Sequence, residues 1–344
     1  MDERALEILN FLHTHPSSSS KVIFENVTTG ISYATVKRTL AQLVADQLVL
    51  PKGQGKGTKY EVSPAYELLH SIDIENYYQQ EIDERVIKSD FNFGVFDILL
   101  ENNILNETER LKLTRLQEQF LNNVGQLTEQ EYKKELERLA IDLSWKSSQI
   151  EGNTYSLLET ERLLKDKETA SGKTKEEAIM LLNHKEAIDF IVDHPDYLIP
   201  LSVSKIEDIH SILIKDLGIE KNLRRKRVGI SGTNYRPLDN EFQIIEALHK
   251  TCEIVNKKDS VFEKAMLTLL LISYIQPFMD GNKRTARIVS NAILMNYKHC
   301  PISFRTVNSI DYKKAMLLFY EQNNISRFKE IFINQFEFAV NTYF

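Results

Sequence analysis

Apolar residues recur at helical spacing in three short segments of the first 64 residues. The i, i+3, i+4 recurrence is typical of amphipathic helices that bury one face. His15-Pro16 ends the first segment, serines 17–20 precede the second and Ser32 precedes the third, as expected of helix stops and caps. The first segment places four apolar residues on one face, the second carries three, and the third turns four inward: Ala5, Ile8, Leu9 and Leu12, then Val22, Ile23 and Val27, then Val36, Leu40, Leu43 and Val44.

Two short apolar segments, 48–50 and 60–62, flank a basic, glycine-rich stretch at 51–59, which predicts a β-hairpin. Three helices followed by such a hairpin resemble a winged helix-turn-helix, so we assign residues 1–64 to one domain. In that fold the third helix enters a DNA major groove and the wing contacts phosphate. The candidate DNA contacts are Lys37, Arg38, Lys52, Lys56 and Lys59.

A winged helix that docks on protein or dimerises is the alternative, because acidic and basic residues nearly cancel over 1–64. The five cations gathered on the third helix and the wing favour DNA. If the lobe dimerises instead of binding DNA, the expected partner is a second copy of this chain.

The rest of the chain predicts a mainly helical protein. Residues 65–104 place aromatic side chains among acids and predict an ordered linker that packs on the next domain. Residues 105–344 form that domain. Thr128 and Glu131 have capping-box spacing and begin a helix predicted to run over about 129–151.

One stretch of the helical part, residues 224–239, has a β-like pattern. Val228 and Ile230 alternate with other residues, residues 231–234 form a turn sequence, and the chain returns through Tyr235. This pattern predicts a β-hairpin that projects from the helical body and touches a ligand or a peptide.

Length, charge and composition narrow the function classes. A chain of 344 residues has room for two or three domains. Its net charge of −6 excludes a generally basic, nucleic-acid-binding surface. The N-terminus lacks the layout of a signal peptide, and the longest apolar stretch, 265–275, is too short for a bilayer. With only two widely separated cysteines, we expect a cytoplasmic protein with no membrane partner.

The most informative stretch, residues 276–287, reads QPFMDGNKRTAR and follows a nearly all-apolar helix. Gly281 allows backbone to approach a phosphate at the start of a new helix, where free N–H groups point outward. Arg284 and Arg287 are spaced i, i+3 and offer planar forks to phosphate oxygens. Asp280 supplies an oxygen ligand for Mg²⁺. The alternative is a solvated helix start with surface ion pairs, but the order of these features favours an anion site.

This stretch resembles the Fic family signature His-Pro-Phe-x-Asp/Glu-Gly-Asn-Gly/Lys-Arg-x-x-Arg at every fixed position except the first, where Gln276 replaces histidine. The resemblance implies an all-helical Fic fold with a β-hairpin flap, ATP and Mg²⁺ as ligands, and AMP transfer to a hydroxyl of a target protein, which includes the chain itself. Asp280 would hold the metal. The phosphate pocket would comprise Gly281, Asn282, Lys283, Arg284 and Arg287.

The same resemblance extends to two further segments. Residues 147–153, SSQIEGN, fit the family's inhibitory pattern Ser/Thr-x-x-x-Glu-Gly/Asn, here Ser147, Glu151 and Gly152. In relatives this glutamate pairs with the second motif arginine, here Arg287, and blocks the ATP γ-phosphate. The flap that clamps the target by strand addition would comprise Val228, Gly229, Ile230, Ser231, Gly232 and Thr233.

Gln276 leaves the activity open, because an amide has no group that accepts a proton near neutral pH. His210 has the spacing of a core-facing residue, and no motif surrounds His184 or His299. One hypothesis is an adenylyltransferase weakened by Gln276 and inhibited by Glu151. A second is a catalytically silent nucleotide sensor whose winged helix regulates transcription. A third is a winged-helix regulator whose helical part only dimerises.

Overall fold

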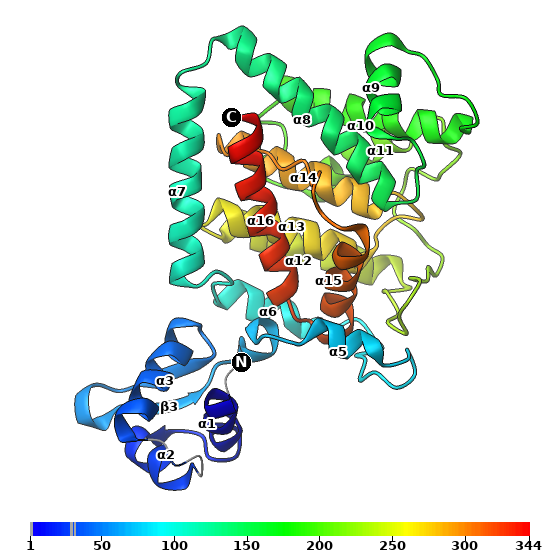
Figure 1. The fold of residues 1–344 in the computed structure, drawn as a ribbon. Helices are drawn as coiled ribbons and strands as arrows, with labels where there is room; N and C mark the ends of the chain where they lie inside the picture. Colours follow the sequence, from blue (N-terminus) through cyan, green and yellow to red (C-terminus); the bar gives the residue numbers. More distant parts are fainter. Residues whose placement is uncertain (1–2, 28–29, 31) are drawn as a thin grey trace.

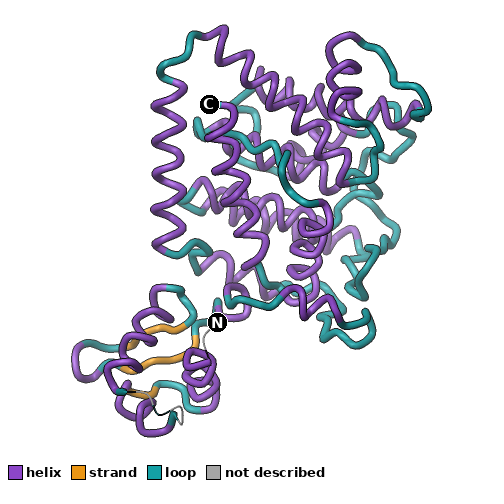
Figure 2. Tube along the Cα trace, in the orientation of Figure 1, coloured by secondary structure: helices purple, strands orange, loops and turns teal. Residues whose placement is uncertain are grey.

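A computed structural model describes residues 3–27, 30 and 32–344, without the side chain of Lys56. A small N-terminal lobe sits at one end of a larger helical body (Figure 1). Within the described residues, strands occur only in the small lobe (Figure 2). The protein is therefore mainly α-helical, with a small antiparallel sheet near its N-terminus.

The N-terminal lobe packs three helices against a three-stranded sheet. The helices are α1 (Glu3–Thr14), α2 (Ser20–Asn26) and α3 (Tyr33–Ala45), and the strands are β1 (Ser18–Ser19), β2 (Val49–Lys52) and β3 (Lys59–Val62). All strand pairs are antiparallel in the order β1-β3-β2. The three helices and the β2–β3 hairpin lie where the apolar pattern predicts them. Strand β1 was not predicted, because two serines carry no periodic signal.

Three short helices connect this lobe to the body: α4 (Tyr66–Leu69), α5 (Ile74–Gln79) and α6 (Gly94–Glu101). The segment is tied to the body along its length. The Ile325 amide donates to the Leu68 carbonyl at 2.9 Å, and the Phe91 ring stacks on Tyr274 with centroids 4.5 Å apart.

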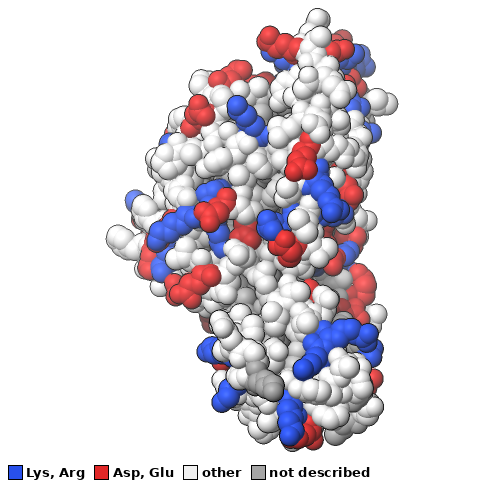
Figure 3. Space-filling view, turned by 90° about the vertical axis from the view of Figure 1, so that its left-hand side faces the viewer, with Lys and Arg blue, Asp and Glu red and all other residues white. Residues whose placement is uncertain are grey.

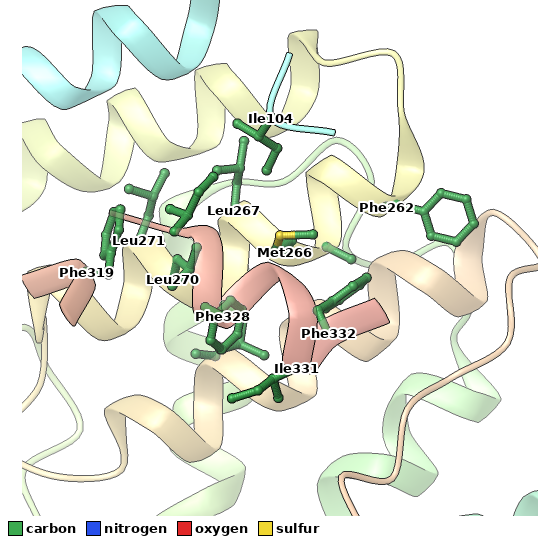
Figure 4. Close-up of a cluster of buried hydrophobic side chains, with 14 of the residues drawn as sticks. Ile104, Phe262, Met266, Leu267, Leu270, Leu271, Phe319, Phe328, Ile331 and Phe332 are labelled. Atoms are coloured by element: carbon green, nitrogen blue, oxygen red, sulfur yellow. The ribbon is translucent and has the colours of Figure 1, made fainter. Parts of the chain in front are cut away.

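The body is built around α13, whose residues from 262 to 275 are all buried. Helices α12 and α14 pack on it. Figure 4 shows side chains of α13 meeting Phe328, Ile331 and Phe332 of the last helix. The helices of the body are α7 (Glu107–Val124), α8 (Glu129–Ile150), α9 (Leu157–Asp166), α10 (Lys175–Asp193), α11 (Val203–Leu213), α12 (Glu241–Lys257), α13 (Val261–Ile275), α14 (Asn282–Asn296), α15 (Ser309–Gln322) and α16 (Ser326–Tyr343).

The predicted hairpin at 224–239 is wrong. This stretch forms no strand, and its one ladder contact is an isolated parallel bridge between Arg236 and Asp90. Buried side chains bind its backbone in place of a second strand. Arg224 donates to the carbonyls of Lys226 and Leu238. The alternating pattern was misleading because Val228 and Ile230 are half-buried while Gly229 and Ser231 are exposed, so this loop has the same alternation as a strand.

Among the described residues, no helix has both the length and the apolar character needed to cross a bilayer.

Candidate functional site

The loop between α13 and α14 is fixed by two left-handed residues. Gln276 caps α13 with φ 51°, and Gly281 caps α14 with φ 81°. A Cβ at Gly281 would lie 3.3 Å from Ile214 Cγ2 and 3.4 Å from His210 Cδ2. The position therefore requires glycine for both its dihedral angle and its space.

Hydrogen bonds inside this loop hold the Gln276 side chain. Its amide nitrogen donates to the Ser273 carbonyl at 2.6 Å, and its oxygen accepts from Asn282 Nδ2 at 3.1 Å. Asn282 also bonds both backbone groups of Phe278 at 2.8 Å. The Gln276 backbone carbonyl accepts from Arg224 Nε at 2.6 Å. Gln276 is thus held at a fixed position on the wall of a cavity of about 240 Å³.

Two arginines of α14 lie buried behind the loop. Arg284 and Arg287 are 1% and 0% exposed, and Arg284 Nη2 lies 3.2 Å from Asp280 Oδ2. Each guanidinium keeps one buried nitrogen, Nη1, that has no hydrogen-bond partner among the described residues. Because a buried charged donor without an acceptor is costly, these two nitrogens favour an anionic ligand.

The end of α8 meets Arg287 from the other side. Glu151 Oε1 accepts from Arg287 Nη2 at 2.6 Å, and Glu151 Oε2 lies 3.7 Å from Lys283 Nζ. Ser147 accepts from Arg287 through its hydroxyl at 2.8 Å and its carbonyl at 3.1 Å. Gly152, with φ 101°, then turns the chain away from the helix. The contact that the inhibitory pattern predicts, Glu151 with Arg287, is present.

Burial and charge act in opposite directions on Glu151. Desolvation disfavours its carboxylate, but the guanidinium of Arg287 and the ammonium of Lys283 outweigh that effect and lower the pKa of Glu151 below 4.5. Glu151 is therefore ionised at neutral pH, and its carboxylate forms an ion pair with the Arg287 guanidinium.

Part of the 228–233 segment faces the same cavity as Gln276. Gly229, Ile230 and Ser231 line it together with Lys283 and residues of α15. Val228 instead borders a second cavity beside Phe91 and Arg236. Within the described structure, no hydrogen bond involves the backbone of residues 228–231.

Residues 200–294 match the Fic/DOC family model. This segment belongs to the Fic/DOC family. The matched range contains the loop, Arg284, Arg287 and the 228–233 segment, and it excludes the N-terminal lobe and Glu151.

Curated relatives carry the same family name. A protein adenylyltransferase Fic of Nematostella vectensis is 33% identical over 175 residues, covering 48% of this chain and 40% of that protein. The adenylyltransferase fic-1 of Caenorhabditis elegans is 23% identical over 177 residues, 48% and 34% of the two chains. The chain thus spans two fifths or less of the length of these relatives.

Solved structures show the same fold. A fragment of C. elegans Fic-1 superposes with a TM-score of 0.59 at 19% identity, covering 69% of this chain and 72% of that one. A Fic-domain signalling protein of Bacteroides thetaiotaomicron gives a TM-score of 0.58 at 19% identity, covering 67% and 94%.

In this Fic segment the carboxylate of Asp280 has the properties of a single metal ligand. Its side chain is 65% exposed, and Oδ1 accepts from the Gly281 amide at 2.6 Å. No group of three or more metal-binding side chains occurs in the described part of the chain. Asp280 would supply a single carboxylate ligand, and a Mg²⁺ ion held there would need its other ligands from phosphate and water.

Sequence reasoning gave no role to His184, which has no motif around it. The structure buries it completely, with neither ring nitrogen hydrogen-bonded to a described residue. Burial, together with the charges of Arg287 and Arg284, lowers its pKa well below 6.5. The His184 imidazole is therefore neutral beside Arg284 and Arg287. It reaches this place because α10 packs against α14.

His210 also touches the Fic loop, as a buried structural residue. Its ring stacks on Phe278 with centroids 3.6 Å apart, and Nε2 lies 2.9 Å from the Asp280 carbonyl. Burial lowers its pKa to about 4, so the ring is neutral at physiological pH. The neutral His210 ring supports the loop through its contacts with Phe278 and the Asp280 carbonyl.

The basic residues predicted to contact DNA differ in their surroundings on the N-terminal lobe. Lys37 and Lys59 are exposed, and Lys52 pairs with Glu61 at 2.5 Å. Arg38 borders a cavity of about 500 Å³ between the lobe and the body. The Lys56 side chain lies outside the described residues. Figure 3 shows Lys and Arg side chains at both edges and at the lower end of this lobe.

Proposed function

We propose that this protein binds ATP in a Fic-type adenylyltransferase site, that Glu151 inhibits the site, and that Gln276 leaves AMP transfer weak or absent. The observation that carries the proposal is the pair of buried arginines behind a glycine-capped helix start, each with an Nη1 that bonds to no described residue. The named activity of the Nematostella and C. elegans relatives supports ATP as the nucleotide and a protein hydroxyl as the acceptor.

In this proposal the nucleotide phosphates lie at the N-terminus of α14. The free amides of the first turn and the helix dipole attract anions, and Arg284 and Arg287 donate charged hydrogen bonds. Mg²⁺ at Asp280 would neutralise phosphate charge. Residues 228–231 present unpaired backbone N–H and C=O groups, which suits pairing with an extended target segment.

Inhibition follows from competition for Arg287. Its Nη2 and Nε are already used by Glu151 and Ser147. A terminal phosphate that needs the same guanidinium must displace the Glu151 carboxylate or sit in a different position. Removing Glu151 should therefore favour productive seating of ATP.

Gln276 limits the chemistry that can follow. Both ends of its amide are engaged, with Ser273 and Asn282, and an amide cannot accept the proton of an attacking hydroxyl. Loss of a general base typically costs about 10²–10⁴-fold in rate. Residual transfer would rest on binding and orientation alone.

Labelled ATP tests the proposal in four proteins: wild type, Gln276→His, Glu151→Gly and the double variant. We expect self-labelling from the double variant and little or none from wild type. Arg284→Ala in the double variant is the control that removes phosphate binding. If the double variant binds Mg-ATP but transfers nothing, the proposed activity is wrong, and nucleotide sensing is the better description.

A nucleotide-sensing, DNA-binding regulator is the second candidate, favoured by the three-helix lobe with a β2–β3 wing and exposed Lys37 and Lys59. Fluorescence anisotropy with duplex DNA over a salt series tests it. Lys37→Ala should weaken binding and lower the salt slope by about one, whereas Lys21→Ala, on an exposed ion pair with Glu25, should not. Lack of binding at low salt would contradict the candidate. Sizing of the same protein would show whether the body instead joins two copies.

A further inference from the structure

The stretch with unpaired backbone, residues 228–231, is anchored at both ends by buried arginines. At its N-terminal end, Arg224 is 0% exposed and donates to the carbonyls of Lys226 and Gln276. At its C-terminal end, Arg85 Nη2 donates to the Gly232 carbonyl at 3.0 Å. Arg224 belongs to the segment that matches the Fic/DOC family. Arg85 belongs to the linker between the N-terminal lobe and the body.

Arg85 is held by a buried ion pair with α15. Its Nη1 lies 3.1 Å from both oxygens of Glu321, and the two side chains are 3% and 0% exposed. Tyr77 donates its hydroxyl to Glu321 at 2.7 Å, and the Arg85 guanidinium lies over the Tyr78 ring at 5.0 Å. Such a pair keeps the guanidinium in one orientation, because losing either partner leaves a buried charge.

The linker continues alongside the segment beyond Gly232. Asn234 donates to Asp83 at 2.9 Å, and the Arg236 amide donates to the Ser89 carbonyl at 2.8 Å. The Arg236 guanidinium pairs with Asp90 at 3.0 Å. Helix α5, which begins this part of the linker, packs on α15 (Figure 1).

The same helix, α15, forms a wall of the Gln276 cavity. Tyr312, Met316 and Tyr320 line that cavity, and Glu321 follows directly. A Cβ at Gly232 would lie 3.5 Å from Leu317 Cδ1, so the segment rests closely on α15. The contact with Arg85 therefore sets the position of residues 229–231 relative to α15 and the cavity.

We propose that Arg85 is a positioning residue: through Glu321 and the Gly232 carbonyl it holds residues 228–231 in the geometry that receives a target segment. This inference rests on the proposed function of that segment. It makes the interlobe linker part of the target-binding apparatus. A partner or ligand that moves the linker would change acceptance of the target without touching the nucleotide pocket.

Hydrogen exchange tests the anchoring directly in the full-length protein. In Arg85→Gln, the amides of Tyr235 and Arg236, which donate to Thr233 Oγ1 and to the Ser89 carbonyl, should exchange at least about tenfold faster, since the neighbouring anchor at Gly232 is lost. The matched control is Arg305→Gln, which removes an arginine from the ion pair with Asp142 elsewhere in the body. If Arg85→Gln lowers protection throughout the body, Glu321→Gln, which keeps the Tyr77 contact, provides the milder variant. Unchanged exchange of the Tyr235 and Arg236 amides in folded variants overturns the proposal.

Transfer is measured by adding Arg85→Gln to the Gln276→His, Glu151→Gly background. We expect slower self-labelling with the same calorimetric affinity for Mg-ATP. If the background itself does not label, the proposed activity fails, while the exchange experiment still decides whether Arg85 anchors the segment. If the background labels and Arg85→Gln labels equally fast, the positioning role fails alone.

Discussion

At the residue scale, the site is defined by how Glu151 and Ser147 share the buried guanidinium of Arg287. Arg287 has its Nε and Nη2 bound by Ser147 and Glu151, and its Nη1 has no partner among the described residues. The arginine is therefore partly satisfied and still able to accept an anion.

Replacing Arg284 by glutamine should weaken Mg-ATP binding about 10–100-fold, because hydrogen bonds to charged groups contribute roughly 1.5–3 kcal/mol. Calorimetric titration measures the affinity. Arg305→Gln is the control and should leave it unchanged. Equal affinities for wild type and Arg284→Gln would place the phosphates elsewhere.

Glu151 should make stability depend on pH in a defined window. Its pKa is lowered in the folded protein, so its ion pair stabilises the fold above the unfolded pKa near 4.5 and is lost as pH falls through the lower, folded value. We expect wild type to be more stable than Glu151→Gln at pH 7 and 5, with the difference shrinking below 4.5. Urea unfolding at several pH values measures it. A difference that grows in acid would mean that the carboxylate is not stabilised by Arg287.

At the element scale, the loop between α13 and α14 depends on one glycine. The apolar α13 ends at a left-handed Gln276, and α14 begins at a left-handed Gly281 that rests on His210 and Ile214. Helix α14 can start at this place only because the chain makes this turn without a side chain.

Gly281→Ala should be more destabilising than Gly172→Ala. Both glycines have a positive φ, 81° and 76°, but a Cβ at Gly172 meets nothing within 4 Å. The dihedral penalty of roughly 1–2 kcal/mol is common to both, and only Gly281→Ala adds the contacts with Ile214 and His210. Urea unfolding gives both free energies, and equal losses would show that the close packing at Gly281 is unimportant.

At the scale of the whole molecule, the linker joins the N-terminal lobe to the body through buried contacts. Asn324, just before α16, donates to the carbonyls of Glu67 and His70, and Gln47 of the lobe donates to the Leu105 carbonyl at 2.8 Å. The lobe, the linker and the segment above the cavity therefore form a continuous set of contacts.

Mg-ATP should stabilise the whole protein, and Glu151 should set the concentration required. A ligand at 100 times its Kd stabilises the folded state by about 2.7 kcal/mol. We expect the Tm of Glu151→Gly to rise at lower ATP concentrations than that of wild type, because Arg287 is then free for phosphate. A thermal-shift titration checks this, with Arg284→Ala as the non-binding control. Identical curves for wild type and Glu151→Gly would mean that Glu151 does not oppose ATP.

The sequence by itself determined the features that depend on neighbouring residues. Apolar spacing located α1 and α3, a nearly all-apolar run located α13, and Thr128 marked the start of α8. The order of glycine and arginines in 276–287 indicated an anion site. These are local signals, since caps, turns and helix faces are set within a few residues.

Only the tertiary structure decided which distant residues meet. It joined Glu151 to Arg287, set His184 beside the arginines, and turned the expected hairpin into a loop held by Arg224 and Arg85. A buried polar group can be satisfied by any partner that the packing brings near, whether a strand or an arginine side chain. Local periodicity does not predict which partner a buried polar group will have, because contacts between residues far apart in the chain decide it.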